Sequence, residues 1–256
     1  MIATIAAKEL KSLFASPLAW MVLAVAQLIG AFAFGKQFDE FLDVQPQLAQ
    51  LASPPGFTEL VVSPLYATTA FILLVAVPLL GMRSIAEERR NQTMVFLTSA
   101  PVSMTQIVLG KFLGIFALVL LIVGLITAMP LTLAASTSLD YGHIASLAGG
   151  VLLIAAGFAA VSLYISSLTT HPMAAAFGAL AALIVMVLMG ESAGEGLRVR
   201  GWELPAALMR VFSPLRNFEP LGKGLVDTYA VACSLLFIVF FLVLAVRRLD
   251  ARRLRG

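Results

Sequence analysis

The charged stretch RSIAEERRNQTMVFLTSAPVS occupies residues 83–103 and separates long runs that carry no charge. The whole chain has 256 residues, of which 60% are hydrophobic and only 12% are charged. This charged share is about half of that in ordinary globular proteins. A water-soluble domain of this length could not bury so much apolar surface. The composition therefore excludes a soluble protein and indicates an integral membrane protein.

The uncharged runs predict six membrane-spanning helices, because about 20 apolar residues cross the hydrocarbon core as a helix. One run, residues 141–190, is about twice that length and is interrupted by TTHP at residues 169–172, so it counts as two spans. The predicted spans belong to a single domain, residues 1–256, and lie near 18–36, 64–82, 110–134, 144–168, 172–190 and 229–247.

Local signals mark where four of these spans begin. Proline follows Ser16, Ser63 and His171, and so stands at the first helical position, where its missing N–H costs nothing. The last span follows Asp227–Thr228, which predicts an N-cap. The first apolar run is longer than the hydrophobic part of a signal peptide and follows an amphipathic segment, so we expect it to be retained.

Lysine and arginine concentrate in alternate connections, and this bias sets the orientation of a membrane protein. With both termini in the cytoplasm, the inner segments carry most basic residues, whereas the short outer loops carry only Lys36. We therefore expect an all-α protein with cytoplasmic N- and C-termini. The alanine-rich composition favours a bacterial cytoplasmic membrane. The net charge of +3 follows this topology and does not indicate nucleic acid.

No Asp, Glu, Lys or Arg falls in the middle of a predicted span. A charge at the bilayer centre costs at least roughly 2.5–3.5 kcal/mol, and the charges that persist there usually mark ion or proton pathways. Their absence argues against an ion-coupled secondary transporter. The polar residues within the spans are interpreted as interhelical hydrogen-bonding groups; they are Gln27, Thr127, Ser162 and Tyr164.

Enzymatic and nucleotide-binding patterns are also missing. The two histidines, His143 and His171, lie at predicted membrane interfaces, and no G-x-S-x-G turn is present. GAFAFGKQ, residues 30–37, matches the front of a phosphate-binding loop, but Gln37 replaces the magnesium-binding Ser or Thr and the glycines belong to a span. We predict no catalytic, cofactor or metal site, so if transport is powered, the energy comes from outside this chain.

Small residues are frequent in the third and fifth spans. Gly110 and Gly114 form a G-x-x-x-G pattern, and AAAFGALAA covers residues 174–182. Such residues let helix backbones approach closely. Packing within the bundle is favoured over a dedicated dimer face.

The charged stretch itself predicts a helix that ends at TSAP, followed by a capping box in which Ser103 is the N-cap and Gln106 reaches back. The first helix has an apolar face, but Arg89 projects into its middle. This suits a protein groove better than a bilayer surface, and a solvated loop helix is the alternative.

The segment RSIAEERRNQTMVFLTSAPVSMTQIVLGKF, residues 83–112, closely resembles the cytoplasmic loop of ABC-2-type permeases, with its E-E/R-R helix followed by T-x-P-V-S and GK. FSPLRNFEPLGKGLVDT, residues 212–228, resembles the gliding-motility-type branch of that family. The resemblance covers almost the whole chain. It implies the ABC-2 exporter fold, with an N-terminal connecting helix at residues 2–14 and a coupling helix within 83–103.

The resemblance also implies partners. Such permeases pair with a second copy or a paralogue, and each is joined to a cytosolic ABC ATPase subunit that binds ATP. The predicted ATPase contacts are Glu87, Glu88, Arg89 and Arg90. Charged residues at such a contact set register and partner choice more than affinity.

The outer segment, residues 191–228, places apolar residues at close to helical spacing and predicts short amphipathic or re-entrant helices. By resemblance it forms an outer gate, or it docks an accessory protein with an extracytoplasmic domain; a simple lid over helix ends is the third reading. The residues assigned to it are Phe212, Pro214, Leu215, Phe218, Gly224 and Asp227.

Two functions thus stay open for a non-catalytic subunit. The first is a permease that forms a translocation path for a separate ATPase. The second is an ATPase-linked membrane anchor that transmits mechanical signals to an outer partner without passing a substrate. The sequence does not choose a substrate.

Overall fold

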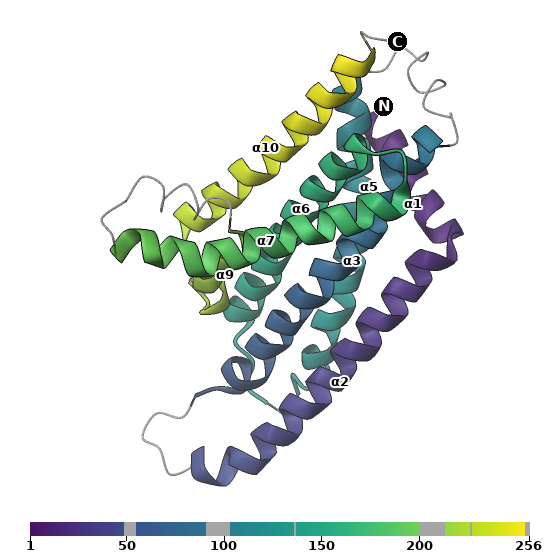
Figure 1. Cartoon of the computed structure of the whole chain (residues 1–256). Coiled ribbons are helices and arrows are strands. Elements are labelled where there is room, and N and C mark those ends of the chain that lie inside the picture. Colours follow the sequence, from purple (N-terminus) through teal and green to yellow (C-terminus); the bar gives the residue numbers. More distant parts are fainter. Residues whose placement is uncertain (49–54, 91–102, 136, 200–212, 226, 254–256) are drawn as a thin grey trace.

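A computed structural model describes residues 1–48, 55–90, 103–135, 137–199, 213–225 and 227–253. In these ranges the chain consists of helices joined by short turns (Figure 1). The elements are α1 (Ile2–Ala15), α2 (Pro17–Leu48), η1 (Thr58–Val62), α3 (Ser63–Arg90), α5 (Met104–Leu131), α6 (Tyr141–Leu168), α7 (Pro172–Val199), α9 (Pro214–Gly222) and α10 (Thr228–Arg253).

Six helical stretches are long and apolar enough to cross a membrane, which confirms the predicted all-α membrane fold. They are α2, η1 with α3, α5, α6, the first part of α7, and α10. The predicted interruption at TTHP is present, since α6 ends at Leu168 and α7 begins at Pro172. Both termini lie at the same end of the bundle (Figure 1). We call it the inner end, after the orientation that the sequence predicts, and we call the opposite end the outer end.

The start of the second span was predicted wrongly. Its helix begins at Thr58 and runs through Pro64, which was expected at the first position. Residues 58–62 form a π-helical turn, and the N–H of Ser63 bonds to the carbonyl of Thr58. The wider turn lets the helix continue past a proline that would otherwise interrupt its bonding.

All six spanning helices pass a predicted bound. α7 continues to Val199 rather than ending at residue 190, so residues 191–199 belong to it and not to the separate outer helices that the sequence predicts.

Two further extensions are those of α2 and α3. α2 continues to Leu48 rather than ending near residue 36. α3 continues to Arg90, so the helix predicted from residue 83 is confirmed over its described part and forms one element with the second span. In both cases the apolar pattern stops but nothing breaks the helix at that point, because charged side chains are compatible with helical backbone. The two extensions lie at opposite ends of the bundle (Figure 1), and that of α3 stays within the packed core, where Ile85 and Ala86 are buried.

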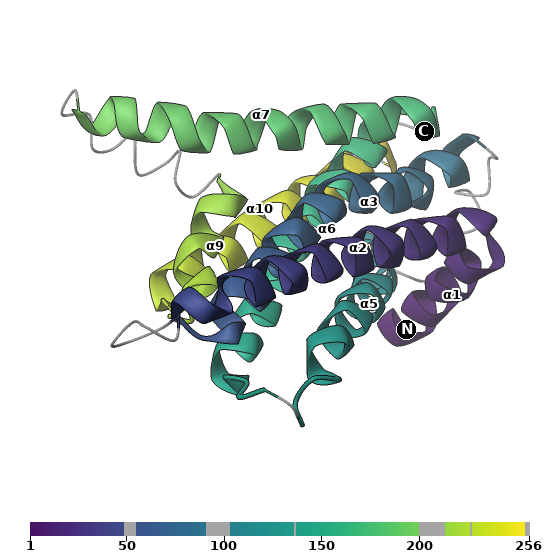
Figure 2. The same cartoon turned by 90° about the horizontal axis from the view of Figure 1, so that it is seen from below.

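α6 is the central helix, and it contacts α3, α5, α7, α9 and α10. Its middle is built of small residues, including Ala155, Ala156, Ala159 and Ala160, all of which are buried. A Cβ on Gly81 of α3 would lie only 2.7 Å from the Cβ of Ser162, so α3 and α6 are close enough to require glycine there. α7 lies across the bundle as an outer layer (Figure 2).

The G-x-x-x-G pattern is used within the chain, as favoured from the sequence. A Cβ on Gly110 would lie 2.6 Å from Ile5, and one on Gly114 would lie 2.7 Å from Glu9. α1 therefore packs directly on the small-residue face of α5. This contact fixes the N-terminal helix to the start of the third span.

Polar residues inside the spans behave only partly as predicted. Gln27 donates to the carbonyl of Ile122 at 3.3 Å, and the Tyr66 hydroxyl lies 2.6 Å from that of Thr127, so these bonds are interhelical. Ser162 was predicted wrongly, because its hydroxyl donates to the carbonyl of Phe158 in its own helix. Tyr164 packs its ring against Phe241, with centroids 5.9 Å apart.

Candidate functional site

Charged side chains and one serine gather at the inner end, where α1, α3 and α5 meet. We call this group the inner cluster; it consists of Glu9, Arg83, Ser84, Glu87, Glu88 and Lys111. Glu9 comes from the second half of α1, Lys111 from the second turn of α5, and the other four from the last two turns of α3.

Lys111 is the centre of the inner cluster and is only 1% exposed. Its ammonium contacts Glu9 at 3.2 Å, Glu88 at 2.9 Å and the carbonyl of Ser84 at 2.6 Å. The Ser84 hydroxyl also donates to Glu9 at 2.9 Å. An ammonium has three N–H donors, so all three are used. A buried charge is tolerated only with this degree of pairing, and the three helices are thereby tied together.

Arg83 and Glu87 form the more exposed side of the inner cluster. The guanidinium donates to both carboxylate oxygens of Glu87, at 2.5 and 3.0 Å, and also to the hydroxyl of Ser16. Ser16 is the residue between α1 and α2. The pair is about one-third exposed, so it faces the aqueous side of the cluster.

A second set of bonds joins the end of α3 to the end of α6. The hydroxyl of Ser166 accepts from the N–H groups of Ile85 and Ala86, at 3.3 and 3.0 Å, and donates to the carbonyl of Met82 at 3.2 Å. Arg89 donates to the carbonyl of Ser167 at 2.9 Å, at the C-terminus of α6. The last turns of α3 are thus bonded to α1, α5 and α6 at once.

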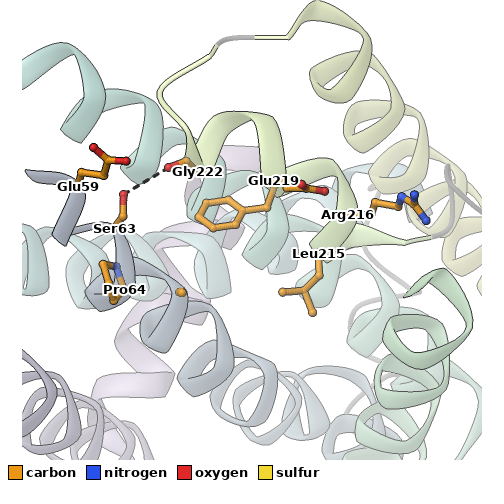
Figure 3. A pocket seen from close by; sticks show the side chains of 9 residues that line it. Glu59, Ser63, Pro64, Leu215, Arg216, Glu219 and Gly222 are labelled. Carbon is orange, nitrogen blue, oxygen red and sulfur yellow. Dashed lines mark hydrogen bonds between the residues drawn. The ribbon is translucent and has the colours of Figure 1, made fainter. Parts of the chain in front are cut away.

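The outer end of the bundle holds a cavity of about 600 Å³ between α9 and the junction of η1 with α3, which we call the outer cavity. Figure 3 shows Glu59, Ser63 and Pro64 on one side and Leu215, Arg216 and Glu219 on the other. The cavity therefore has apolar walls with charges of both signs. A hydrogen bond from Lys223, at 2.9 Å, lowers the pKa of the Glu219 carboxyl.

α9 is a short helix fixed to the outer ends of α3 and α6. The carbonyl of Gly222 accepts from Ser63 at 3.3 Å and lies 3.0 Å from Nε2 of His143. The carbonyl of Leu221 accepts from Ser146 at 3.0 Å. These bonds satisfy carbonyls that a helix C-terminus leaves without partners.

The sequence profile of the ABC-2 family transporter proteins matches residues 3–254, nearly the whole chain. The chain belongs to the ABC-2 family. No curated protein matches it significantly. Membership makes it a membrane subunit of an ABC transporter and implies an ABC ATPase subunit as its partner.

The four predicted ATPase-contact residues of this ABC-2 protein lie together in the last turn of α3. Glu88 and Arg89 have partners inside the bundle, Lys111 and the carbonyl of Ser167, and Glu87 pairs with Arg83. Arg90 is exposed at the tip. The remainder of the predicted coupling region, residues 91–102, lies outside the described residues, and the predicted capping box at its end is confirmed.

The predicted outer residues of this ABC-2 protein come together only in part. Pro214 begins α9, Leu215 and Phe218 both line the outer cavity, and Phe218 also packs against Gly150 of α6. Gly224 and Asp227 lie after α9. Gly224 has a φ of 76°, which terminates that helix, and Asp227 caps α10 by accepting from the N–H of Tyr229 at 2.9 Å. Phe212 lies outside the described residues.

Sequence reasoning missed the long-range partners in both regions. Glu9 belongs to the segment that the sequence predicts as an amphipathic connecting helix. Lys111 is predicted only as one of the basic residues on the cytoplasmic side. His143 was predicted to lie at a membrane interface, but its partner Gly222 was not identified. Only the close packing of α1 on Gly110 and Gly114 brings Glu9 to Lys111, and this contact cannot be read from spacing along the chain.

Proposed function

We propose that the chain is the permease subunit of an ATP-driven transporter, forming a translocation path together with a second copy or a paralogue. A cytosolic ABC ATPase binds ATP and docks on the inner end of α3 and the segment that follows it. The observation that carries this proposal is the continuity of α3 from the outer cavity to Arg90, together with its bonds to three other helices at the inner end.

The bonding pattern divides the four charged residues into two roles. Arg90 is exposed and Glu87 is about one-third exposed, so these two side chains can reach a docked protein. Glu88 and Arg89 face inward and hold α3 to Lys111 and to α6. A movement imposed on the tip of α3 would thereby reach α1, α5 and α6 without an intervening flexible joint. Packed helices transmit such a movement as rigid elements.

The orientation follows from the same arrangement. We propose a bacterial cytoplasmic membrane with both termini in the cytoplasm. Two observations support this orientation: basic residues concentrate in the connections at the inner end of the bundle, and both termini lie at that end. The outer cavity and α9 would then lie at the extracytoplasmic mouth. There α9 would act as a gate element, since its bonds to Ser63 and Ser146 connect it to α3 and α6.

A site-specific crosslink tests this proposal. A photoreactive amino acid would replace Arg90, and the matched control would carry it at Ala251, which is also exposed near the inner end but on α10. We expect a crosslink to an ATP-binding-cassette protein from position 90 and none from position 251. Equal crosslinking from both positions, or none from position 90, would contradict docking at the end of α3.

A further inference from the structure

An apolar groove runs between α2 and α3, and nothing in the permease mechanism above uses it. Its volume is about 540 Å³. The lining runs from Leu18 to Ile29 on α2 and from Thr68 to Leu79 on α3. Thr68 is its polar residue, and that hydroxyl donates to the carbonyl of Pro64 at 2.9 Å. We call this the tail groove.

The tail groove has the length of a single membrane leaflet. At a rise of 1.5 Å per residue, the stretch Leu18–Ile29 extends about 16 Å. Half of a hydrocarbon core of about 30 Å is about 15 Å. An acyl chain of one leaflet could therefore lie in the groove over its whole length.

A polar cavity of about 220 Å³ adjoins the inner end of the tail groove. The two share Leu18 on α2, and on α3 the last groove residue, Leu79, is one turn before Arg83 of the cavity. The cavity is lined by the inner cluster and Ser16. An apolar channel that ends in a partly exposed polar cavity at the membrane boundary matches an amphiphile, with its tail in lipid and its headgroup at the interface.

The charges of the cavity select among headgroups. Its three carboxylates exceed its two cations by one, so an anionic headgroup is disfavoured. Arg83 uses three of its five N–H donors on Glu87 and Ser16, which leaves two for a phosphate among the described contacts. Each oxygen of Glu87 retains acceptor capacity for an ammonium beside that phosphate.

We infer that the tail groove and the adjoining cavity bind a zwitterionic phospholipid with a primary ammonium headgroup, its phosphate on Arg83 and its ammonium on Glu87. The lipid lies in the leaflet at the inner end, which is the cytoplasmic leaflet in the proposed orientation. The site uses only residues of α1, α2, α3 and α5. Glu87 is also within reach of the proposed ATPase, so the test uses the permease without that subunit, and its result does not depend on the proposed function.

Photocrosslinking of lipid in nanodiscs tests the inference. The full-length permease would be placed in phosphatidylcholine discs containing a small fraction of either phosphatidylethanolamine or phosphatidylglycerol with a diazirine in the acyl chain. Labelled peptides would then be mapped. We expect phosphatidylethanolamine to label residues 18–29 and 68–79, and phosphatidylglycerol to label them about tenfold less, as loss of one charge-assisted contact implies. Unlabelled phosphatidylethanolamine should compete.

Two variants and a matched control sharpen this test. Val75→Trp fills the groove from a half-exposed position, and Val239→Trp makes the same change at a similarly exposed site on α10, with 48% and 55% exposure. Only the first should remove the groove label. Glu87→Gln should abolish the preference for phosphatidylethanolamine while leaving label on the exposed face of α10 unchanged.

Two outcomes would overturn the inference. The first is that both lipids label the groove equally and that Val75→Trp does not reduce this label. The groove would then hold only bulk lipid. Absence of groove label, together with a disulfide between two copies of a Val75→Cys variant that lacks Cys233, would mean that the groove is an interface between copies.

Discussion

Lys111 and Glu9 are 102 positions apart in the sequence, and their charged atoms are 3.2 Å apart in the structure. The same ammonium contacts Glu88 at 2.9 Å. One buried lysine therefore joins the N-terminal helix, the end of the second span and the start of the third. In the proposed mechanism this is the point at which movement of α3 reaches the rest of the bundle.

Removing the charge of Lys111 should destabilise the protein strongly. Lys111→Met keeps the volume but takes the ammonium away from the buried Glu9 and the partly buried Glu88, and breaking such an ion pair typically costs about 3–5 kcal/mol. We expect a clear drop in the thermal unfolding temperature in detergent. The triple variant that also carries Glu9→Gln and Glu88→Gln should recover most of the loss, because it leaves no uncompensated charge. An unchanged unfolding temperature for Lys111→Met would contradict the buried triad.

Gly81→Ala should weaken the contact between α3 and α6. The added Cβ would lie 2.7 Å from that of Ser162, so the helices must separate, at a cost of about 1–3 kcal/mol. Gly124→Ala is the matched control, since a Cβ there meets nothing within 4 Å and alanine favours a helix by about 0.5–1 kcal/mol. Denaturant unfolding of both variants should give shifts of opposite sign. If Gly81→Ala is neutral, α3 and α6 are not in this contact.

The hydroxyl of Ser166 should matter more than that of Ser162. Ser166→Ala removes a hydroxyl that accepts from the N–H groups of Ile85 and Ala86 and donates to the carbonyl of Met82, and the loss of a buried hydrogen bond costs about 0.5–1.5 kcal/mol. Ser162→Ala removes only a bond to Phe158 within the same helix. Hydrogen exchange should accelerate at residues 82–90 in the first variant and stay unchanged in the second. Equal exchange in both would place the α3–α6 connection elsewhere.

Gly224→Ala should loosen the end of α9. Gly224 has a φ of 76°, and an L-residue in that conformation costs about 1–2 kcal/mol. The new Cβ would also lie 3.1 Å from the ring of His143. We expect faster hydrogen exchange in α9, with no change at the inner end. Gly56→Ala, where a Cβ meets nothing within 4 Å, serves as control. Unaltered exchange in α9 would mean that this turn does not hold the helix.

The sequence predicted local features well where a local signal exists. The break between Leu168 and Pro172, the Ser103–Gln106 capping box and the Asp227 cap are all present. Each depends on residues within a few positions of one another. The position of Pro64 gave a wrong helix start, because the π-turn before it has no comparable local signature in the sequence. That turn packs against α2 and α6, which are distant contacts.

The candidate site was predictable only in composition. The charges of residues 83–90 stand out in the sequence, but their division into inward and outward groups does not. That division depends on Ser166, Ser167 and Lys111, which arrive from other spans. Charge patterns along one helix cannot identify partners that tertiary packing supplies. The tail groove was not predictable either, because its two walls come from different helices, α2 and α3, and form a groove only when those helices pack together.

The most direct measurement is affinity purification of the tagged chain in mild detergent, with ATP hydrolysis assayed and co-purified proteins identified by mass spectrometry. Wild type, Arg90→Glu and the control Arg248→Glu, on α10, would be compared. We predict that an ABC ATPase subunit and its hydrolysis are retained by wild type and by Arg248→Glu and lost from Arg90→Glu. A wild-type preparation that contains no ABC ATPase would contradict the proposed function. Full retention of the ATPase by Arg90→Glu would contradict docking at the end of α3.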